Sequence, residues 1–363
     1  MMIPFMDLSR QYNLLKDEIL KKISEVCEKR DFILGSFVEK FENSFAKWTE
    51  RRFCIGCSSG TTALSLALEA TGIKEGDEVI TTPLTFIATA EAICHIKAKP
   101  VFADIDPLTL NLSPEKVKEK ITKKTKAIIP VHLYGSPADM NSFVKIAKEH
   151  NLIIIEDCAQ SHGAVLNGYQ TGSFGKAGAF SFFPGKNLGA FGDAGAVVTD
   201  DQNLDFLIKK LRNHGRTEKY VHDIIGYNHR MDGIQAAILE VKLKYLSEWI
   251  TKRRRIAKMY DTLLKDIKKP VVLKEAQSAY HLYVILVKER EKVQKALKEK
   301  GIETAVHYPV PLHLQPAFSF LGYKKNDLPI AEKAAEEVLS IPFFPEMTDE
   351  EIYKVAESIN SVV

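Results

Sequence analysis

The feature that most constrains the fold is a regular alternation of strand-like and helix-like segments between about residues 53 and 200. Short apolar runs rich in β-branched residues are separated by helical-looking stretches, a pattern typical of parallel strands joined by crossover helices. The last two runs are separated only by a glycine-rich segment, so they are expected to be adjacent strands without a crossover helix. The predicted strands span residues 53–57, 78–82, 100–104, 126–131, 152–156, 178–183 and 194–199. This pattern predicts an α/β fold with a mostly parallel central sheet.

Helix signals lie between and after these strands. A helix is expected to begin near Thr61 and to end before Gly72, which is a favourable residue just past a helix C-terminus. Ser113 followed by Pro114 is typical of an N-cap with proline in the first turn. Residues 232–264 predict one long amphipathic helix, whose length indicates that it bridges two domains.

The part of the chain after this helix predicts a second, smaller domain. A strand is expected over residues 280–287 and a helix over residues 291–300, closed by Gly301. The chain has 363 residues, and single hydrophobic cores stop growing at roughly 250–300 residues. We therefore predict a large domain over residues 1–245, which includes the N-terminal segment, and a smaller α+β domain over residues 246–363.

Composition and charge exclude several classes of partner. Hydrophobic residues make up 45% and charged residues 27% of the chain, and 50 basic against 47 acidic side chains leave a net charge of only +3. This balance favours neither nucleic acid nor a membrane surface as the partner. Asp7 and Arg10 interrupt the region where a signal peptide would need an unbroken apolar core. A cytoplasmic protein with a small or protein partner is expected.

The cysteines do not form a pattern that indicates disulfides or a metal. Their odd number and wide spacing are not typical of a disulfide framework. One pair has CxxC spacing, but a zinc site would need a second pair or suitably placed histidines, so no metal is expected. The five residues are Cys27, Cys54, Cys57, Cys94 and Cys158.

The residues that follow three of the predicted strands are the candidates for chemistry. Open parallel sheets bind ligands at the carboxyl ends of their strands. The first strand is followed by Ser58–Thr62, a small hydroxyl-rich segment at a helix N-terminus, where free N–H groups favour a phosphate. Asp157 follows the strand over 152–156, and Lys186 follows the strand over 178–183. Taken singly, each is as well explained by a helix cap, a turn or a solvated lysine.

Together these groups match the requirements of pyridoxal 5'-phosphate (PLP). That cofactor needs a lysine for a Schiff base, a carboxylate that keeps the pyridine nitrogen protonated, a phosphate anchor and an aromatic side chain over its ring. Lys186 and Asp157 supply the first two, and Phe86 is a candidate for the aromatic side chain, although a phenylalanine there is also compatible with the core.

Over nearly its whole length the sequence resembles the DegT/StrS-type sugar aminotransferases. These enzymes have the aspartate aminotransferase fold, fold type I of the PLP-dependent transferases. The matching motifs occur in family order at residues 3–12, 32–42, 58–68, 156–164, 181–196, 227–239 and 307–318. The resemblance implies a large PLP-binding domain with a mostly parallel sheet, followed by a smaller C-terminal α+β domain.

The resemblance also implies roles for individual residues. Lys186 would bond the cofactor and then move the proton, Asp157 would pair with the pyridinium nitrogen, and Gln160 would contact the ring hydroxyl. The cofactor-binding set is completed by the predicted phosphate-binding residues Gly60, Thr61, Thr62 and Ser181, by Phe86, and by Asn228 from the neighbouring subunit of a homodimer. The family often has an acidic residue at the position of Thr62 and alanine at that of Cys158, which leaves the cofactor assignment intact.

The substrate implied by the resemblance is a keto sugar linked to a nucleotide, with L-glutamate as amino donor and the pyridoxamine form of the cofactor as carrier. Candidate substrate residues are Arg230 from the partner chain, His307, Tyr308 and His313. The motif at 307–318 is more similar to members that aminate C3 of a UDP- or dTDP-linked 3-keto sugar. Amination at C4, a sugar dehydratase with the same cofactor and a non-catalytic regulator on the same fold remain alternatives. In the related dehydratases, histidine replaces the lysine, so Lys186 argues against them.

Overall fold

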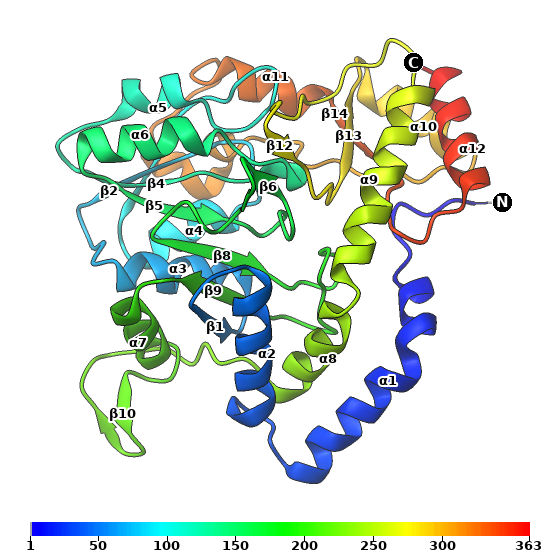
Figure 1. The fold of residues 1–363 in the computed structure, drawn as a ribbon. Helices are drawn as coiled ribbons and strands as arrows, with labels where there is room; N and C mark the ends of the chain where they lie inside the picture. Colours follow the sequence, from blue (N-terminus) through cyan, green and yellow to red (C-terminus); the bar gives the residue numbers. More distant parts are fainter. Residues whose placement is uncertain (1) are drawn as a thin grey trace.

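The computed structural model describes residues 2–363, and its largest feature is a seven-stranded sheet (Figure 1). All seven strands were predicted from the sequence, and their ends differ from the prediction by at most two residues. β9 is antiparallel to both of its neighbours, and the other neighbouring pairs are parallel. This confirms the mostly parallel sheet and the adjacency of the last two strands. In spatial order they are β1 (Phe53–Cys57), β9 (Gly195–Thr199), β8 (Ala177–Ser181), β5 (Ile153–Asp157), β4 (Thr125–Ile129), β2 (Glu78–Thr81) and β3 (Lys99–Phe102).

Helices cover both faces of this sheet because its central strands are apolar on both sides. Ile155 belongs to a cluster with Leu64 on one face, whereas the preceding residue Ile154 belongs to a cluster with Phe143 on the other. One face is covered by α3 (Gly60–Ala70), α4 (Ala88–His95) and α7 (Gln202–Leu211). The opposite face is covered by α2 (Gly35–Trp48), α5 (Pro114–Lys120), α6 (Met140–His150) and α8 (Gly233–Leu243).

The single long helix predicted over residues 232–264 is wrong, because the structure has two helices there. α8 ends at Leu243, and α9 (Leu246–Leu263) starts after a two-residue break. The interruption contains no proline or glycine. The α-helical hydrogen bonding is interrupted by a tighter turn, because the Tyr245 N–H donates to the Lys242 carbonyl three residues back at 3.0 Å. The change of core comes later, within α9, since Ile250 still packs with Ala236 of α8 whereas Tyr260 packs in a separate C-terminal core. Figure 1 shows α9 rising from α8 to the C-terminal part.

The C-terminal part is built on a two-stranded antiparallel sheet, β13 (Tyr283–Leu286) and β14 (Val338–Ile341). β13 is shorter than the strand predicted over 280–287, and Tyr280 has a left-handed backbone with φ of 44°. The predicted helix before Gly301 is confirmed as α10. The helices of this part are α9, α10 (Arg290–Glu299), α11 (Pro329–Glu337) and α12 (Asp349–Asn360). Together they form the α+β arrangement expected from the sequence.

The start of the chain contacts this C-terminal part. Ile3 forms a parallel bridge with Ile302, and α1 (Leu8–Lys29) then runs away from it along α8. The domain boundary between residues 245 and 246 stays a prediction, although the break between α8 and α9 lies beside it.

Smaller elements complete the described chain. A three-stranded sheet is formed by β6 (Val165–Leu166), β7 (Tyr169–Gln170) and β12 (Ala276–Gln277), and a hairpin beside α7 by β10 (Arg216–Glu218) and β11 (Val221–His222). Three short 3-10 helices are η1 (Leu133–Gly135), η2 (Leu312–Leu314) and η3 (Pro316–Leu321). Within residues 2–363, no helix combines the length and the apolar character needed to cross a bilayer.

Candidate active site

A cavity of about 490 Å³ lies where the parallel strands of the large sheet end. Its walls include the ends of β5 and β8, the N-terminus of α3 and segments of the C-terminal part. The structure brings nine of the predicted site residues together in this lining. They are Gly60, Thr61, Phe86, Asp157, Gln160, Ser181, Lys186, His307 and Tyr308.

The N-terminus of α3 is shaped to hold an anion. Gly60 and Thr61 occupy the first turn, where free backbone N–H groups and the helix dipole favour negative charge. A Cβ at Gly60 would lie 2.6 Å from the Cβ of Ser181, so only glycine lets the helix come this close to the end of β8. Thr62 does not line the cavity, because its side chain and that of Ser59 cap the helix reciprocally.

Asp157 ends β5 with its carboxylate buried beside the cavity. Its Oδ2 accepts a hydrogen bond from Thr89 Oγ1 at 2.8 Å, and its Oδ1 accepts one from the Ala159 N–H at 3.1 Å. Burial raises the pKa of this carboxyl, while these two donors act in the opposite direction. A carboxylate has room for further donors, so a protonated ring nitrogen in the cavity would complete its bonding.

Lys186 lies in a tight turn after β8. Its backbone N–H donates to the Phe183 carbonyl, and a Cβ at Gly189 would lie 2.2 Å from the Pro184 carbonyl oxygen, so the turn needs glycine there. No side chain among residues 2–363 forms a hydrogen bond or ion pair with its Nζ. Burial lowers the pKa of the amine to about 8, although the nearby charge of Asp157 acts to raise it. The amine is therefore unpaired and closer to its neutral form than an exposed lysine.

Two neighbouring side chains hold the turn that carries Lys186. Asn187 Nδ2 donates to the Ala279 carbonyl at 3.1 Å, and the buried Lys242 donates to the Gly189 carbonyl. Burial lowers the pKa of Lys242 to about 8 as well. The two lysines differ, because Lys242 is buried and bonded to a backbone oxygen whereas the half-buried Lys186 lines the cavity.

The amide of Gln160 is oriented by residues that the sequence reasoning missed. Its Oε1 accepts a hydrogen bond from the Tyr134 N–H at 2.6 Å, so its Nε2 is the atom left to donate, and it reaches Tyr308 Oη at 3.1 Å. The Tyr134 hydroxyl donates to the His307 carbonyl oxygen. Gln160 can therefore present a donor to a ring hydroxyl in the cavity.

Aromatic and imidazole rings form the remaining wall. Phe86 is 55% exposed, and its ring centroid lies 5.9 Å from that of Tyr308, so its face is available for stacking. His307 pairs through Nδ1 with Ser340 Oγ at 2.8 Å, and burial lowers the pKa of its ring to about 4. The ring is therefore neutral near pH 7.

Thr85, Thr89, Tyr134 and His281 were missed by the sequence reasoning, although Thr85, Thr89 and His281 line this cavity. The hydroxyls of Thr85 and Thr89 lie 3.1 Å apart and lead to Asp157. Their four-residue spacing directly after a predicted strand was a signal that could have found them. Tyr134 and His281 reach the site through tertiary contacts, and no local pattern marks them.

Four predicted substrate or cofactor residues lie outside the cavity lining of this chain: Thr62, described above, and His313, Asn228 and Arg230. His313 is buried and bonded through Nε2 to Glu332 Oε1 at 3.1 Å. Asn228 forms a backbone bridge with Asn213 on the α7 side. Arg230 and Asn228 were expected to serve a neighbouring subunit, and those roles stay predictions.

Two cysteine or histidine clusters are explained without a metal. Cys54 and Cys57 belong to the cores on opposite faces of the sheet, because residues three apart on a strand point in opposite directions. They therefore cannot act as a CxxC pair. His132, Glu156 and Cys158 lie close together, but Glu156 already accepts hydrogen bonds from His132 and three backbone N–H groups.

The cavity thus fits pyridoxal phosphate by the chemistry of its groups. It combines an N–H-rich helix terminus that meets a serine hydroxyl, a buried carboxylate with spare acceptor capacity and an unpaired amine of lowered pKa. An exposed aromatic face and an oriented amide donor lie in the same walls.

Comparison with known proteins agrees with this assignment. The model of the DegT/DnrJ/EryC1/StrS aminotransferase family matches residues 13–360. A "Pleiotropic regulatory protein" of Geobacillus stearothermophilus is 49% identical over 99% of this chain and 98% of its own. The UDP-N-acetyl-3-dehydro-alpha-D-glucosamine 3-aminotransferase of Acidithiobacillus ferrooxidans is 44% identical over 98% of this chain and 97% of its own.

A solved structure shows the same fold. The X-ray structure of S. venezuelae DesV in complex with a ketimine intermediate superposes with a TM-score of 0.97. It is 39% identical in sequence, and the match covers 99% of this chain and 98% of that one. The similarity therefore extends over both the large sheet and the C-terminal part.

Proposed function

The chain belongs to the DegT/DnrJ/EryC1/StrS aminotransferase family, and we propose that it transfers the amino group of L-glutamate to a keto carbon of a nucleotide-linked sugar. The single observation that carries the proposal is the unpaired amine of Lys186 in the same cavity as the buried carboxylate of Asp157. Pyridoxal phosphate, when bound, supplies an electron sink for the carbon that loses or gains a proton.

Each residue of the candidate site has a separate role in the proposed reaction. The neutral amine of Lys186 can bind the aldehyde, and it can then accept a proton and return it, because its pKa of about 8 lies near neutral pH. Asp157 holds a ring proton in place through its negative charge. Gln160 donates from Nε2, and the first turn of α3 with Ser181 binds the phosphate.

We place amination at C3 of a 3-keto sugar, linked to UDP or dTDP. The relative from Acidithiobacillus ferrooxidans, which is named for amination at C3 of a UDP-linked sugar, supports this choice. His307 and Tyr308 line the cavity and are the candidates for contact with the sugar. Asn228 and Arg230 of the partner subunit would complete the site in a homodimer, and the cytoplasm remains the expected location.

A regulator is the second candidate function, because one relative is named a pleiotropic regulatory protein. A protein that only regulates would not need a lysine, a carboxylate and an anion-binding turn held in one cavity. The presence of all three therefore favours catalysis.

The test is to supply the purified protein with the cofactor, L-glutamate and UDP- or dTDP-linked 3-keto and 4-keto sugars. We expect a visible absorbance band that glutamate bleaches, release of 2-oxoglutarate, and a new amine at C3 of the sugar. Amine at C4 would overturn the position assigned here. A protein that stays colourless with added cofactor would favour the regulator.

A further inference from the structure

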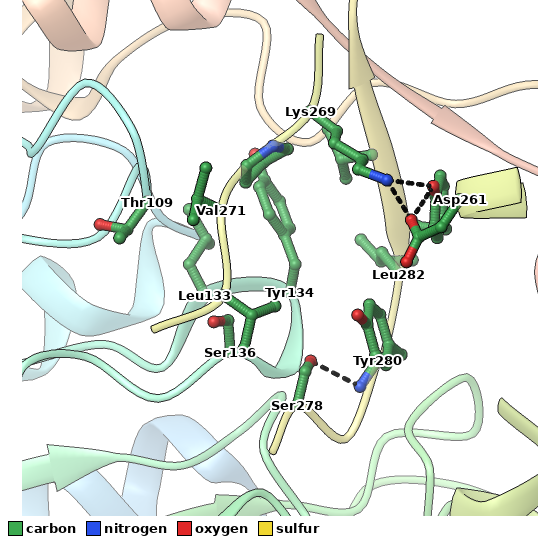
Figure 2. Close-up of a pocket in the computed structure, with 14 residues that line it drawn as sticks. Thr109, Leu133, Tyr134, Ser136, Asp261, Lys269, Val271, Ser278, Tyr280 and Leu282 are labelled. Carbon is green, nitrogen blue, oxygen red and sulfur yellow. Dashed lines mark hydrogen bonds and ion pairs between the residues drawn. The ribbon is translucent and has the colours of Figure 1, made fainter. Parts of the chain in front are cut away.

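A second cavity of about 240 Å³ adjoins the active site and shares Leu282 with it. It lies between η1 and the segment that leads into β13, and Figure 2 shows the residues that surround it. Most of its wall is apolar, with Leu133, Val271 and the ring of Tyr134 on one side. The ion pair of Lys269 and Asp261 lies at the opposite side.

One polar group in the wall of this cavity lacks a partner. Ser136 is only 8% exposed, and its Oγ forms no hydrogen bond with any residue from 2 to 363. The neighbouring Ser278 differs, because its hydroxyl donates to the Gly135 carbonyl at 2.9 Å. The Oγ atom is itself covered by protein, so a rotation about χ1 is needed to turn it toward the cavity. Because buried hydroxyls are normally paired, a ligand that brings one polar atom would favour this rotation.

Two residues of the wall have an unfavourable backbone. Tyr134 has φ of 58° and Tyr280 has φ of 44°, in the left-handed region that side chains larger than glycine rarely adopt. Such residues persist where surrounding contacts hold them, and they are found preferentially at ligand sites and switch regions. They lie in the two segments that separate this cavity from the active site.

The wall between the two cavities is bonded directly to active-site groups. The Tyr134 N–H donates to the Gln160 amide, and its hydroxyl donates to the His307 carbonyl. Next to Tyr280, the Ala279 carbonyl accepts from Asn187, the residue after Lys186. A ligand that presses on Tyr134 or Tyr280 would therefore displace groups that contact the cofactor.

We propose that this cavity binds a small uncharged single-ring alcohol of the phenol type, and that its occupancy is communicated to the active site through Tyr134 and Tyr280. The apolar wall disfavours a charged ligand, because the charge would lose its hydration. Benzene fits a cavity of roughly 150 Å³, so this larger cavity, which opens to solvent beside the exposed Val271, has room for a substituted ring. Ser136 bonds the ligand hydroxyl.

The binding test compares phenol with benzene, using the shift in melting temperature and calorimetry on the whole protein. We expect saturable binding of both, with phenol bound about tenfold more tightly because of one hydrogen bond. Ser136→Ala should remove this preference and keep the binding of benzene. Absence of saturable binding, or a preference that survives in Ser136→Ala, would overturn the site.

Filling the cavity gives an independent test of its position. Val272 is half-buried in its wall, and Val272→Phe should abolish the binding of both probes. Val144→Phe is the matched control, since Val144 is 41% exposed on α6 and outside the cavity. Wild-type affinity in Val272→Phe would show that the probes bind elsewhere and overturn the proposal.

Communication is tested by measuring phenol affinity with and without pyridoxal phosphate, and cofactor affinity with and without phenol. Thermodynamic linkage requires that pyridoxal phosphate changes the phenol affinity by the same factor as phenol changes the cofactor affinity. We expect this factor to be about three or more. Equal phenol affinity in both states would overturn the communication. These measurements use no sugar substrate, so their failure is distinguishable from failure of the proposed reaction.

Discussion

Glu156 and Asp157 are adjacent on β5, both are buried, and their side chains leave the strand on opposite faces of the sheet. Glu156 faces the side of α2 and α6, where it accepts hydrogen bonds from His132 Nε2 and from the N–H groups of Gly172, Phe174 and Gly175, at 2.7–3.0 Å. Within residues 2–363, Asp157 accepts two hydrogen bonds, and it borders the cavity.

The difference teaches how to separate a structural buried acid from a functional one. A carboxylate has about four acceptor positions, and the protein fills all of those of Glu156. The Ala138 N–H donates to His132 Nδ1, so His132 donates to Glu156 as the neutral Nε2–H tautomer. Asp157 retains acceptor capacity toward the cavity, where a ligand can use it. The following predictions test this contrast.

The largest effect is expected for Lys186→Ala, which removes the half-buried, unpaired amine of the candidate site. Transamination should fall by about 10⁴-fold or more, because general acid–base catalysis alone contributes about 10²–10⁴-fold and the covalent anchor is lost as well. Release of 2-oxoglutarate measures the transamination rate, and the visible absorbance of the cofactor reports the loss of the covalent anchor. The matched control is Lys242→Met, which should keep the absorbance band. Loss of the band in both variants would contradict a special role for Lys186.

Glu156→Gln is expected to act on stability. The amide nitrogen would face backbone donors, and breaking a buried charged network costs about 3–5 kcal/mol. Denaturant unfolding should show this loss, whereas kcat of the folded enzyme should change by less than about tenfold. Unchanged stability, or a turnover defect as large as that of Asp157→Asn, would remove the contrast between the two acids.

Asp157→Asn is expected to act on turnover. Loss of one preorganised charge at a reacting group lowers kcat by about 10²–10³-fold. Cofactor retention should fall far less, because the residues that would hold the phosphate and the Lys186 amine that would bind the aldehyde are unchanged. Equilibrium dialysis with the cofactor and steady-state kinetics give the two quantities. Equal losses of turnover and of cofactor retention would contradict the role assigned to Asp157.

Thr89→Val should have a smaller effect of the same kind. It removes the hydroxyl that donates to Asp157 Oδ2, so the pKa of that carboxyl, already raised by burial, should rise further. Turnover should fall by about tenfold, and the absorbance of the bound cofactor should become more sensitive to pH. Thr89→Ser keeps the hydroxyl and should behave like the wild type. A defect of equal size in Thr89→Ser would point to lost packing.

An effect of similar size, without any substitution, is a pH dependence set by Lys186. Burial lowers the pKa of its amine to about 8, and the neutral amine is the form that bonds an aldehyde. The rate at which protein without cofactor captures pyridoxal phosphate should therefore rise about tenfold between pH 7 and pH 9 and then level off. Stopped-flow absorbance measures this rate. A rate that still climbs steeply to about pH 10 would indicate an unperturbed lysine.

Much of the fold could be predicted because its signals are local. The seven strands were recognisable from apolar β-branched runs, and the helix ends at Ser113 and Gly72 from cap chemistry. Lys186 and Asp157 could be predicted as site residues because ligand sites lie past the carboxyl ends of parallel strands. The break between α8 and α9 could not be predicted, because the two residues between these helices include no proline or glycine that would mark it.

The sequence by itself determined the α/β class, the positions of the strands, and the lysine, acid and helix terminus of the site, since periodicity and turn chemistry act over a few residues. Only the tertiary structure decided how each side chain is used. In the folded chain Thr62 caps a helix, His313 is hydrogen-bonded to Glu332, and the Tyr134 N–H donates to the Gln160 side chain. The reason is physical: a buried polar group must find a partner, and that partner is chosen by proximity in the folded chain, whatever its distance along the sequence.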